Sequence, residues 1–160
     1  MRVLQWDVVI LVDGGGCMER SIRFNNALNA IKNILSSISD IHVTIGIFVD
    51  NGLLPFCYGE PGECLDAIGT LKIVGGRGCW DRGLFEASRL LSSKKSVAYI
   101  IGCCALPCDN GGELSLRLYD RVYYFCIDRC PSRLTRLLRD YGFARIACSL
   151  DEFVALVRGG

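Results

Sequence analysis

The chain of 160 residues suits one domain with a single core, and we expect residues 1–160 to form that domain. Apolar residues make up 51% of the sequence and its mean hydropathy is +0.31, which excludes a disordered chain and suits a sheet buried on both faces. The formal net charge of +1 excludes a global electrostatic field that would recruit nucleic acid or anionic lipid, so we expect neither as a partner.

Hydrophobic periodicity predicts strands that alternate with helices along the chain. Continuous apolar runs are typical of parallel strands covered on both faces, and apolar residues spaced by three and four are typical of helices. In chain order we expect a strand at 7–12, a helix at 19–38, strands at 43–49 and 53–58, a short helix at 63–71, a helix at 81–91, a strand at 97–101, a short helix at 114–118, a strand at 121–127, a helix from 131 or 132 to 142, a strand at 144–147 and a last helix.

Turn and capping residues refine these elements. Asp50-Asn51-Gly52 is a tight-turn signal, so the third strand should pair antiparallel with the second and lie at an edge. Ser149 and Glu152 have the spacing of a capping box at the start of the last helix. The predicted fold class is therefore α/β, a three-layer α/β/α arrangement around an open, mostly parallel six-stranded sheet with one antiparallel edge strand.

The ends and the cysteine content suggest a cellular setting. The apolar run 8–12 is too short for the core of a signal peptide, and no stretch has the length of a membrane helix, so we expect a cytoplasmic protein or an intracellular viral one without a membrane contact. Ten cysteines and an excess of arginine over lysine favour a thermophilic source, an archaeon or its virus, where intracellular disulfides occur. Metal-binding or buried thiols are the alternative.

Three segments carry a resemblance to a known family. The run from Trp6 to Met18, WDVVILVDGGGCM, resembles the first strand and metal loop of von Willebrand factor type A (vWA) domains, which carry Asp-x-Ser-x-Ser; Asp13 matches, whereas Gly15 and Cys17 stand in place of the serines. The segment 75–87 resembles the second metal loop, and 97–104 resembles the fourth strand. Segments 121–128 and 149–156 continue the match in order, so the resemblance covers essentially the whole chain.

The resemblance implies where a ligand crevice lies and which metal ligands are missing. Loops after the first and fourth strands would meet where the winding of the sheet reverses. The threonine that binds Mg²⁺ in the family falls at Gly78, or at Arg77 under a one-residue shift, and the second aspartate falls at Cys103. Only Asp13 of five expected ligands remains, and thiolates suit Mg²⁺ poorly. We therefore expect a degenerate metal site with no metal and no cofactor, in which Asp13 bonds to backbone amides.

Taken together, the resemblance favours a protein-binding module that is not an enzyme. The family commonly mediates protein contacts, and Trp80 and Arg82 belong to residue types enriched in interface hot spots. Burial of Trp80 in the core is the equal alternative. The expected binding face consists of Asp13, Gly15, Cys17, Gly78, Trp80, Arg82 and Cys103.

Two further functions remain open. A metal-dependent nuclease or hydrolase could gather Asp13, Asp81, Asp109 and Asp128 near the carboxyl ends of the strands, although helix capping explains several of them as well. A structural subunit of a larger assembly, viral ones included, would form a homo-oligomer. His42 is expected at the opposite end of the sheet, far from any crevice, and the arginines at 129, 133, 136 and 139 are expected on a solvated helix face.

The cysteines give specific predictions. Cys57 and Cys64 should form a local disulfide, because Pro61-Gly62 can turn the chain back between them. Cys17, Cys79, Cys103, Cys104 and Cys108 should converge at the crevice. We expect at least one disulfide among these five, with Cys104–Cys108 or Cys17–Cys103 preferred, and no zinc.

Overall fold

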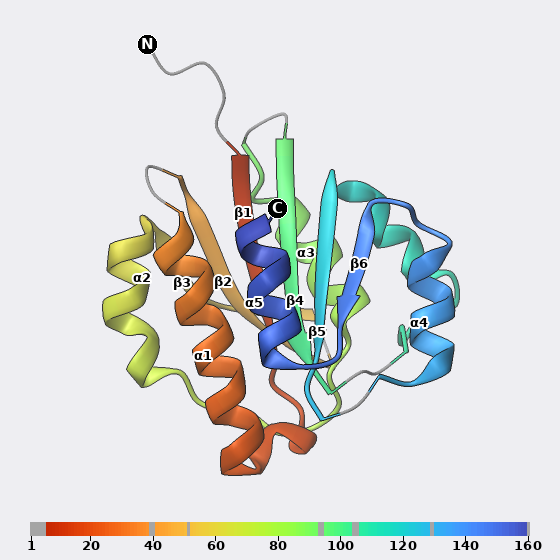
Figure 1. Cartoon of the computed structure of the whole chain (residues 1–160), viewed down its shortest axis with the longest axis horizontal. Coiled ribbons are helices and arrows are strands. Elements are labelled where there is room, and N and C mark those ends of the chain that lie inside the picture. The colour runs from red at the N-terminus through yellow and green to blue at the C-terminus, as the bar shows by residue number, and fades with distance from the viewer. Residues whose placement is uncertain are drawn as a thin grey trace.

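The computed structural model describes residues 6–38, 41–50, 52–92, 95–103, 106–128 and 130–159. A six-stranded sheet forms its middle layer (Figure 1), with the strand order β3-β2-β1-β4-β5-β6. All neighbouring strands are parallel except β2 and β3, which pair antiparallel. The strands are β1 (Trp6–Asp13), β2 (Val43–Val49), β3 (Gly52–Gly59), β4 (Lys95–Gly102), β5 (Arg121–Cys126) and β6 (Ala144–Ala147).

Helices cover both faces of this sheet. The α-helices are α1 (Ser21–Ser37), α2 (Pro61–Ala67), α3 (Trp80–Ser88), α4 (Ser132–Arg139) and α5 (Leu150–Gly159), and the 3-10 helices are η1 (Gly16–Glu19), η2 (Ile68–Thr70) and η3 (Gly112–Leu118). In Figure 1, α1, α2 and α5 lie in front of the sheet and α3 lies behind it; α4, at the right, packs into the same core as α3. The predicted fold class, a mostly parallel sheet with one antiparallel edge strand and helices on both faces, is confirmed.

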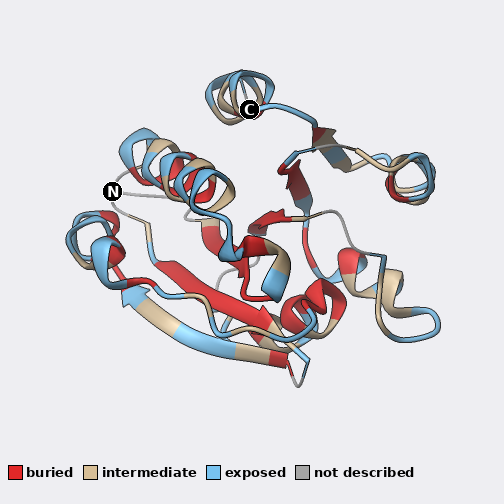
Figure 2. Cartoon of the chain, turned by 90° about the horizontal axis from the view of Figure 1, so that it is seen from below, coloured by how far each residue is buried: buried red, intermediate tan, exposed pale blue. Residues whose placement is uncertain are grey.

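Two hydrophobic cores result from the alternation of side chains along β1. Val8, Ile10 and Val12 pack into the core beneath α1 and α5, whereas Val9 and Leu11 pack into the core beneath α3 and α4. Figure 2 shows buried residues along the strands between these helices. Because both faces of the strand are buried, its sequence is apolar without interruption.

The position of β1 creates the expected crevice. It lies between β2 and β4, so the winding of the chain reverses there. The carboxyl ends of β1 and β4 lie at the lower edge of Figure 1, the edge that Figure 2 views from below. The loops that follow these two strands, together with the loop before α3, therefore meet at one end of the molecule.

The predicted capping box is present, and several predicted helices have different bounds. The amide of Glu152 donates a hydrogen bond to the Ser149 hydroxyl, and the Glu152 carboxylate accepts one from the amide of Cys148, both at 3.2 Å, so the capping box is present in a shifted form. The expected helix at 81–91 is α3, which ends at Ser88, and the helix expected to reach residue 142 is α4, which ends at Arg139. The expected single helix at 19–38 is instead η1 followed by α1, with extended backbone at Arg20 between them.

Four disulfides connect the described residues. They are Cys17–Cys103, Cys57–Cys64, Cys79–Cys108 and Cys130–Cys148. The predicted Cys57–Cys64 bond is present, as is Cys17–Cys103, one of the two preferred alternatives. The alternative Cys104–Cys108 is wrong, because Cys108 bonds to Cys79 with their Cα atoms 5.5 Å apart; Cys104 itself lies outside the described residues.

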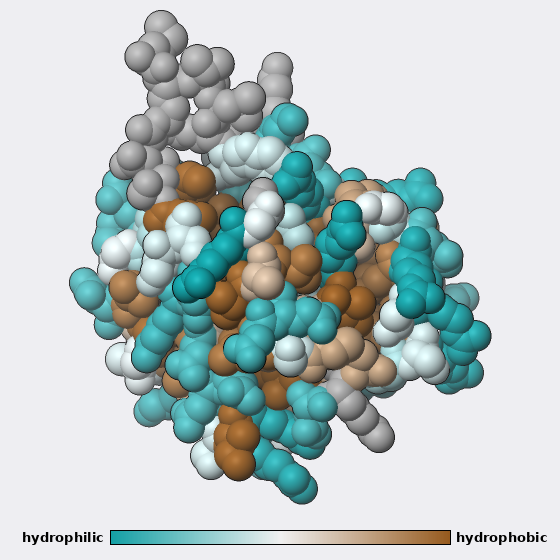
Figure 3. Space-filling model, in the orientation of Figure 1, coloured by the Kyte–Doolittle hydropathy of each residue, from teal (hydrophilic) through white to brown (hydrophobic). Residues whose placement is uncertain are grey.

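The surface over the helices is mainly polar, as expected where helices cover a hydrophobic core. The face formed by α1, α2 and α5 presents mainly hydrophilic residues, with smaller hydrophobic areas between them (Figure 3). Among the described residues, no helix combines the length and the apolar character needed to cross a membrane.

Candidate functional site

The carboxylate of Asp13 lies at the centre of the predicted crevice and is buried. Oδ1 accepts a hydrogen bond from the amide of Gly15 at 2.8 Å, and Oδ2 accepts one from the amide of Cys103 at 3.2 Å. Burial raises the pKa of this carboxyl, and the two backbone hydrogen bonds oppose part of that rise. Asp13 therefore ties the loop after β1 to the loop after β4, as its predicted role in bonding backbone amides requires.

Glycines enclose this carboxylate closely. A Cβ atom on Gly78 would collide with Asp13 Oδ1, and one on Gly102 would lie 3.1 Å from Oδ2. The two glycine-rich loops are also joined by backbone hydrogen bonds, from the amide of Gly75 to the carbonyl of Gly14 at 2.7 Å and from the amide of Gly16 to the carbonyl of Gly76 at 2.9 Å. The space that side-chain ligands would need is therefore occupied by backbone.

Cys17 and Cys103 complete the same cluster. Their Cα atoms are 6.4 Å apart, their sulfurs are bonded to each other, and Cys17 Sγ lies 3.5 Å from Asp13 Oδ2. A disulfide sulfur carries no proton to donate and no negative charge for a cation. The residues present do not fit Mg²⁺, which requires about six oxygen ligands, because Asp13 supplies the one charged oxygen group here.

The remaining residues of the predicted face are divided between core and surface. Gly15 and Gly78 are buried, Cys17 and Cys103 are half-buried, and Arg82 is part-exposed. Trp80 does not belong to a binding face, since it is 0% exposed and packs edge-to-face on Tyr124 with ring centroids 5.9 Å apart. The alternative of core packing holds for Trp80 because it begins α3 on the side that faces the sheet.

Arg82 projects from the same helix end to the surface. Its Nε and Nη2 atoms donate to the two carboxylate oxygens of Asp109, at 2.9 and 2.8 Å, and Nη1 donates to the carbonyl of Asp50. Hydrogen bonding to Asp109 raises the pKa of Arg82, and the guanidinium lowers the pKa of Asp109. This two-point geometry holds the guanidinium in one orientation at the carboxyl end of the sheet.

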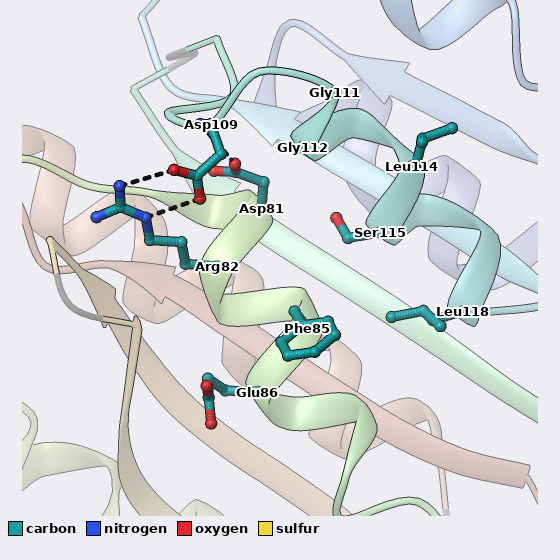
Figure 4. A pocket seen from close by; sticks show the side chains of 10 residues that line it. All are labelled: Asp81, Arg82, Phe85, Glu86, Asp109, Gly111, Gly112, Leu114, Ser115 and Leu118. Atoms are coloured by element: carbon teal, nitrogen blue, oxygen red, sulfur yellow. Dashed lines mark hydrogen bonds and ion pairs between the residues drawn. The ribbon is translucent and has the colours of Figure 1, made fainter.

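Beside this ion pair, a groove runs between α3 and η3 (Figure 4). It has a volume of about 470 Å³, within the range typical of ligand pockets. Its apolar lining consists of Phe85, Leu114 and Leu118, which are 49%, 56% and 43% exposed. Three large apolar side chains that remain exposed around one hollow form an apolar surface which water solvates poorly.

Polar groups complete the groove. Asp81, Glu86 and Asp109 line it with Arg82, so its lining carries three carboxylates and one guanidinium. Asp81 is itself held in place, since its oxygens accept hydrogen bonds from the amides of Cys108 and Asp109, both at 3.0 Å. The hydroxyl of Ser115, another lining residue, is buried and has no hydrogen-bond partner among the described residues. The lining of the groove thus combines apolar walls with the buried carboxylate of Asp81 and the more exposed charged groups of Arg82, Glu86 and Asp109.

The carboxylates proposed for a nuclease have separate partners. Asp13 and Asp81 bind backbone amides, Asp109 binds Arg82, and Asp128 forms an ion pair with Arg23 at 2.6 Å. Among the described residues, the one group of three metal-binding side chains is Asp13, Cys17 and Cys103. His42 is exposed at the start of β2, stacked on Tyr58 at 5.5 Å, far from the crevice as expected. On α4, Arg133, Arg136 and Arg139 are exposed as predicted, and Arg129 lies outside the described residues.

Sequence reasoning missed the groove. Phe85 follows the buried Leu84 in the expected helix at 81–91, and Leu114 and Leu118 fall in the expected short helix at 114–118. The available signal was the phase of α3, in which Phe85 falls outside the apolar stripe formed by Leu84 and Ala87. The Cys79–Cys108 bond joins the chain before α3 to the loop before η3, and α3 packs against η3.

Comparison with solved structures identifies the fold. No family model matches the sequence, and no curated protein matches it. Proximal thread matrix protein 1 from the mussel byssus superposes with a TM-score of 0.76 at 11% identity, and a von Willebrand factor type A protein from Catenulispora acidiphila does so with a TM-score of 0.71 at 17% identity. The pilus adhesin SpaC from Lactobacillus rhamnosus GG reaches 0.67 at 14% identity.

These three likenesses extend over nearly all of this chain but over less than half of each of the three other chains. The comparisons cover 97%, 98% and 99% of this chain and 46%, 42% and 30% of the other three, in the same order. At such low identity they show the fold alone: the chain has a vWA-like fold.

Proposed function

We propose that this vWA-like chain is a non-catalytic module that binds a protein partner without a metal ion, through the groove between α3 and η3 and the adjoining Arg82–Asp109 pair. The observation that carries the proposal is the groove itself, in which three exposed apolar side chains surround a hollow of about 470 Å³. Binding there would remove apolar surface from water, the main favourable term in protein association.

The charged residues that line the groove indicate what the partner carries. Three carboxylates and one guanidinium line the groove, and Arg82 is already paired with Asp109. A segment that inserts a large apolar side chain and places a lysine or arginine next to it would match both features. The ion pair would orient this segment, because its two hydrogen bonds fix the guanidinium before binding.

Two further observations support a binding role without a metal. The cluster around Asp13 holds a disulfide and backbone amides where the family resemblance places metal ligands. One of the solved structures with this fold is a pilus adhesin, which is compatible with protein binding by the fold.

Selection from a displayed library of random peptides tests the proposal. Peptides that bind the wild-type protein are counter-selected against the variant Phe85→Asp, and Val74→Asp serves as the matched control, since Val74 is 57% exposed outside the groove. We expect enriched peptides with an apolar residue beside a basic one, which bind Val74→Asp as tightly as the wild type and are unaffected by a chelator. Failure to enrich any Phe85-dependent peptide, or an acidic consensus, would contradict the proposal.

The alternative of a structural subunit gives a different result. If a second copy of this chain occupies the groove, the protein elutes from a sizing column as a dimer, and Phe85→Asp dissociates it to a monomer. A protein that stays monomeric at high concentration leaves the groove free for another partner.

A further inference from the structure

The half-buried Cys17–Cys103 disulfide adjoins a hollow of the surface distinct from the groove. Cys17, Cys103, Arg23, Ile127 and Asp128 line a pocket of about 310 Å³. Among the four disulfides that join described residues, Cys130–Cys148 is also partly accessible, whereas Cys57–Cys64 and Cys79–Cys108 each contain a buried cysteine. The pocket gives small solutes a path to the sulfur–sulfur bond.

A potential third ligand lies next to these sulfurs. The sulfurs of Cys17 and Cys103 and a carboxylate oxygen of Asp13 all lie within 4.8 Å of one another. Each Asp13 oxygen accepts one backbone hydrogen bond, which leaves further lone-pair positions, since a carboxylate offers about four acceptor sites. A cation bound there would also compensate the buried negative charge of the ionised carboxylate, which no lysine or arginine of the described residues contacts.

We propose that reduction of the Cys17–Cys103 disulfide creates a binding site for a thiolate-binding divalent ion such as Zn²⁺, with Cys17, Cys103 and Asp13 as ligands and water in the fourth position. Two reductant thiols supply two electrons and two protons: the Cys17–Cys103 bond breaks, two protein thiols form, and the reductant becomes its disulfide. Each protein thiol then releases a proton as its sulfur binds the metal, whose oxidation state does not change.

The geometry permits this change with little movement of the backbone. Zn–S bonds of about 2.3 Å in a tetrahedron place two sulfurs about 4 Å apart. With Cα atoms 6.4 Å apart, the sulfurs can separate to that distance by rotation about their Cα–Cβ bonds. Backbone amides fix the Asp13 carboxylate, and the pocket admits the water. The soft donors distinguish this site from one for Mg²⁺, which prefers oxygen ligands.

The pocket is also bordered by a pair of charged residues that order its wall. Arg23 donates to the carbonyl of Cys17 at 3.0 Å and to the carboxylate of Asp128 at 2.6 Å. Asp128 has a φ of 86°, a left-handed conformation that is uncommon outside glycine, asparagine and aspartate. These contacts involve residues outside the ligand cluster and hold the loop that carries Cys17. The ligand positions should therefore persist when the disulfide opens.

The experiment uses the full chain with Cys130→Ser and Cys148→Ser, which removes the second partly accessible disulfide of the described residues. Mild treatment with dithiothreitol, followed by its anaerobic removal, should leave two alkylatable thiols, identified by mass spectrometry as Cys17 and Cys103. Titration with Co²⁺ should then give a thiolate charge-transfer absorption that saturates at one equivalent and is displaced by Zn²⁺. The oxidised protein should give none.

Two variants assign the site. Cys17→Ser with Cys103→Ser should abolish the absorption, and Asp13→Asn should weaken binding at least as much as the roughly 10- to 100-fold that loss of an outer partner of a metal ligand costs. Reduced, folded protein that binds no Co²⁺ or Zn²⁺, or binding that survives in the Cys17→Ser, Cys103→Ser variant, would overturn the proposal.

If reduction unfolds the protein, the metal titration is carried out on the unreduced variant Cys17→His instead. This change opens the disulfide without reductant and places an imidazole, a thiol and a carboxylate at the same positions. We expect Asp13-dependent Zn²⁺ binding, seen as a raised melting temperature, and its absence would count equally against the proposal. The outcome is independent of peptide binding at the groove, so either proposal can fail alone.

Discussion

Gly78 faces the carboxylate of Asp13 so closely that a methyl group on its Cα atom would overlap Oδ1. The resemblance to vWA domains places a metal-binding threonine at this position. Gly78→Thr should therefore not restore a metal site; it should displace the carboxylate and lower the free energy of unfolding by about 1–3 kcal/mol, the usual cost of overpacking. Denaturant unfolding with and without Mg²⁺ measures this.

Gly142→Ala provides the control for that substitution. No atom lies within 4 Å of the position of its added Cβ, so its stability should stay close to that of the wild type. A Gly78→Thr protein as stable as Gly142→Ala, or one that Mg²⁺ stabilises, would contradict the packing described around Asp13.

Trp80 should matter for stability and Phe85 for binding. Trp80 is fully buried against Tyr124, so Trp80→Ala should cost about 3–5 kcal/mol of unfolding free energy. Phe85, on the same helix, is half-exposed, and Phe85→Ala should change stability by about 0.5 kcal/mol or less. Equal losses of unfolding free energy in the two variants, measured by denaturant unfolding, would contradict the placement of Trp80 in the core and Phe85 at the surface.

The sequence predicted the sheet better than it predicted the site. Unbroken apolar runs identify the parallel strands, and Asp50-Asn51-Gly52 identifies the hairpin, because both signals are local. The burial of Trp80 is not a local property, since it depends on how the loop before α3 directs the first turn of the helix towards the sheet. The sequence pattern there does not show that Trp80 is buried while Arg82 lies at the surface.

The cysteines show the same limit. Cys57–Cys64 was predictable because a short turn brings the two together. Cys79–Cys108 joins two irregular loops whose approach depends on the packing of η3 against α3, which no sequence pattern indicates. Cys130–Cys148 was within reach of sequence reasoning: β5 and β6 are neighbouring parallel strands, so the loops that follow them begin side by side.

The pH dependence of stability should report the buried Asp13 carboxyl. Burial raises its pKa in the folded state, so the folded protein binds the proton more tightly than the unfolded chain. Its ionisation therefore reduces stability as pH rises from the ordinary aspartate value, about 3.9, through the raised folded value, and the cost persists at higher pH. Relative to Asp13→Asn, the wild-type protein should gain stability as pH falls through this window.

Melting temperatures of the two proteins, measured from pH 3 to pH 8, test the sign. The substitution Asp13→Asn replaces one acceptor oxygen by a donor, so we expect a constant difference in melting temperature between the two proteins. Only the change of this difference with pH reports the ionisation of Asp13. A wild-type advantage that shrinks on acidification would mean that the hydrogen bonds from Gly15 and Cys103 outweigh burial.

The thermophilic, intracellular setting proposed from the cysteines also has a thermal test. Intracellular disulfides are typical of hyperthermophiles, whereas elsewhere disulfides are typical of oxidising compartments. A protein from a hyperthermophile should melt above about 90 °C in its oxidised form, while a melting temperature in the range of about 45–65 °C would favour a mesophilic protein from an oxidising compartment. Scanning calorimetry of the oxidised chain distinguishes them.

The most direct test of the central claim, that this vWA-like chain binds without a metal ion at the family position, is a calorimetric titration of Mg²⁺ into the oxidised protein. Asp13 supplies one carboxylate whose oxygens already accept backbone hydrogen bonds, and the neighbouring cysteines are joined in a disulfide. We predict no saturable heat of binding at millimolar Mg²⁺, in the wild type or in Asp13→Ala. Tight one-site binding that Asp13→Ala abolishes would contradict the account.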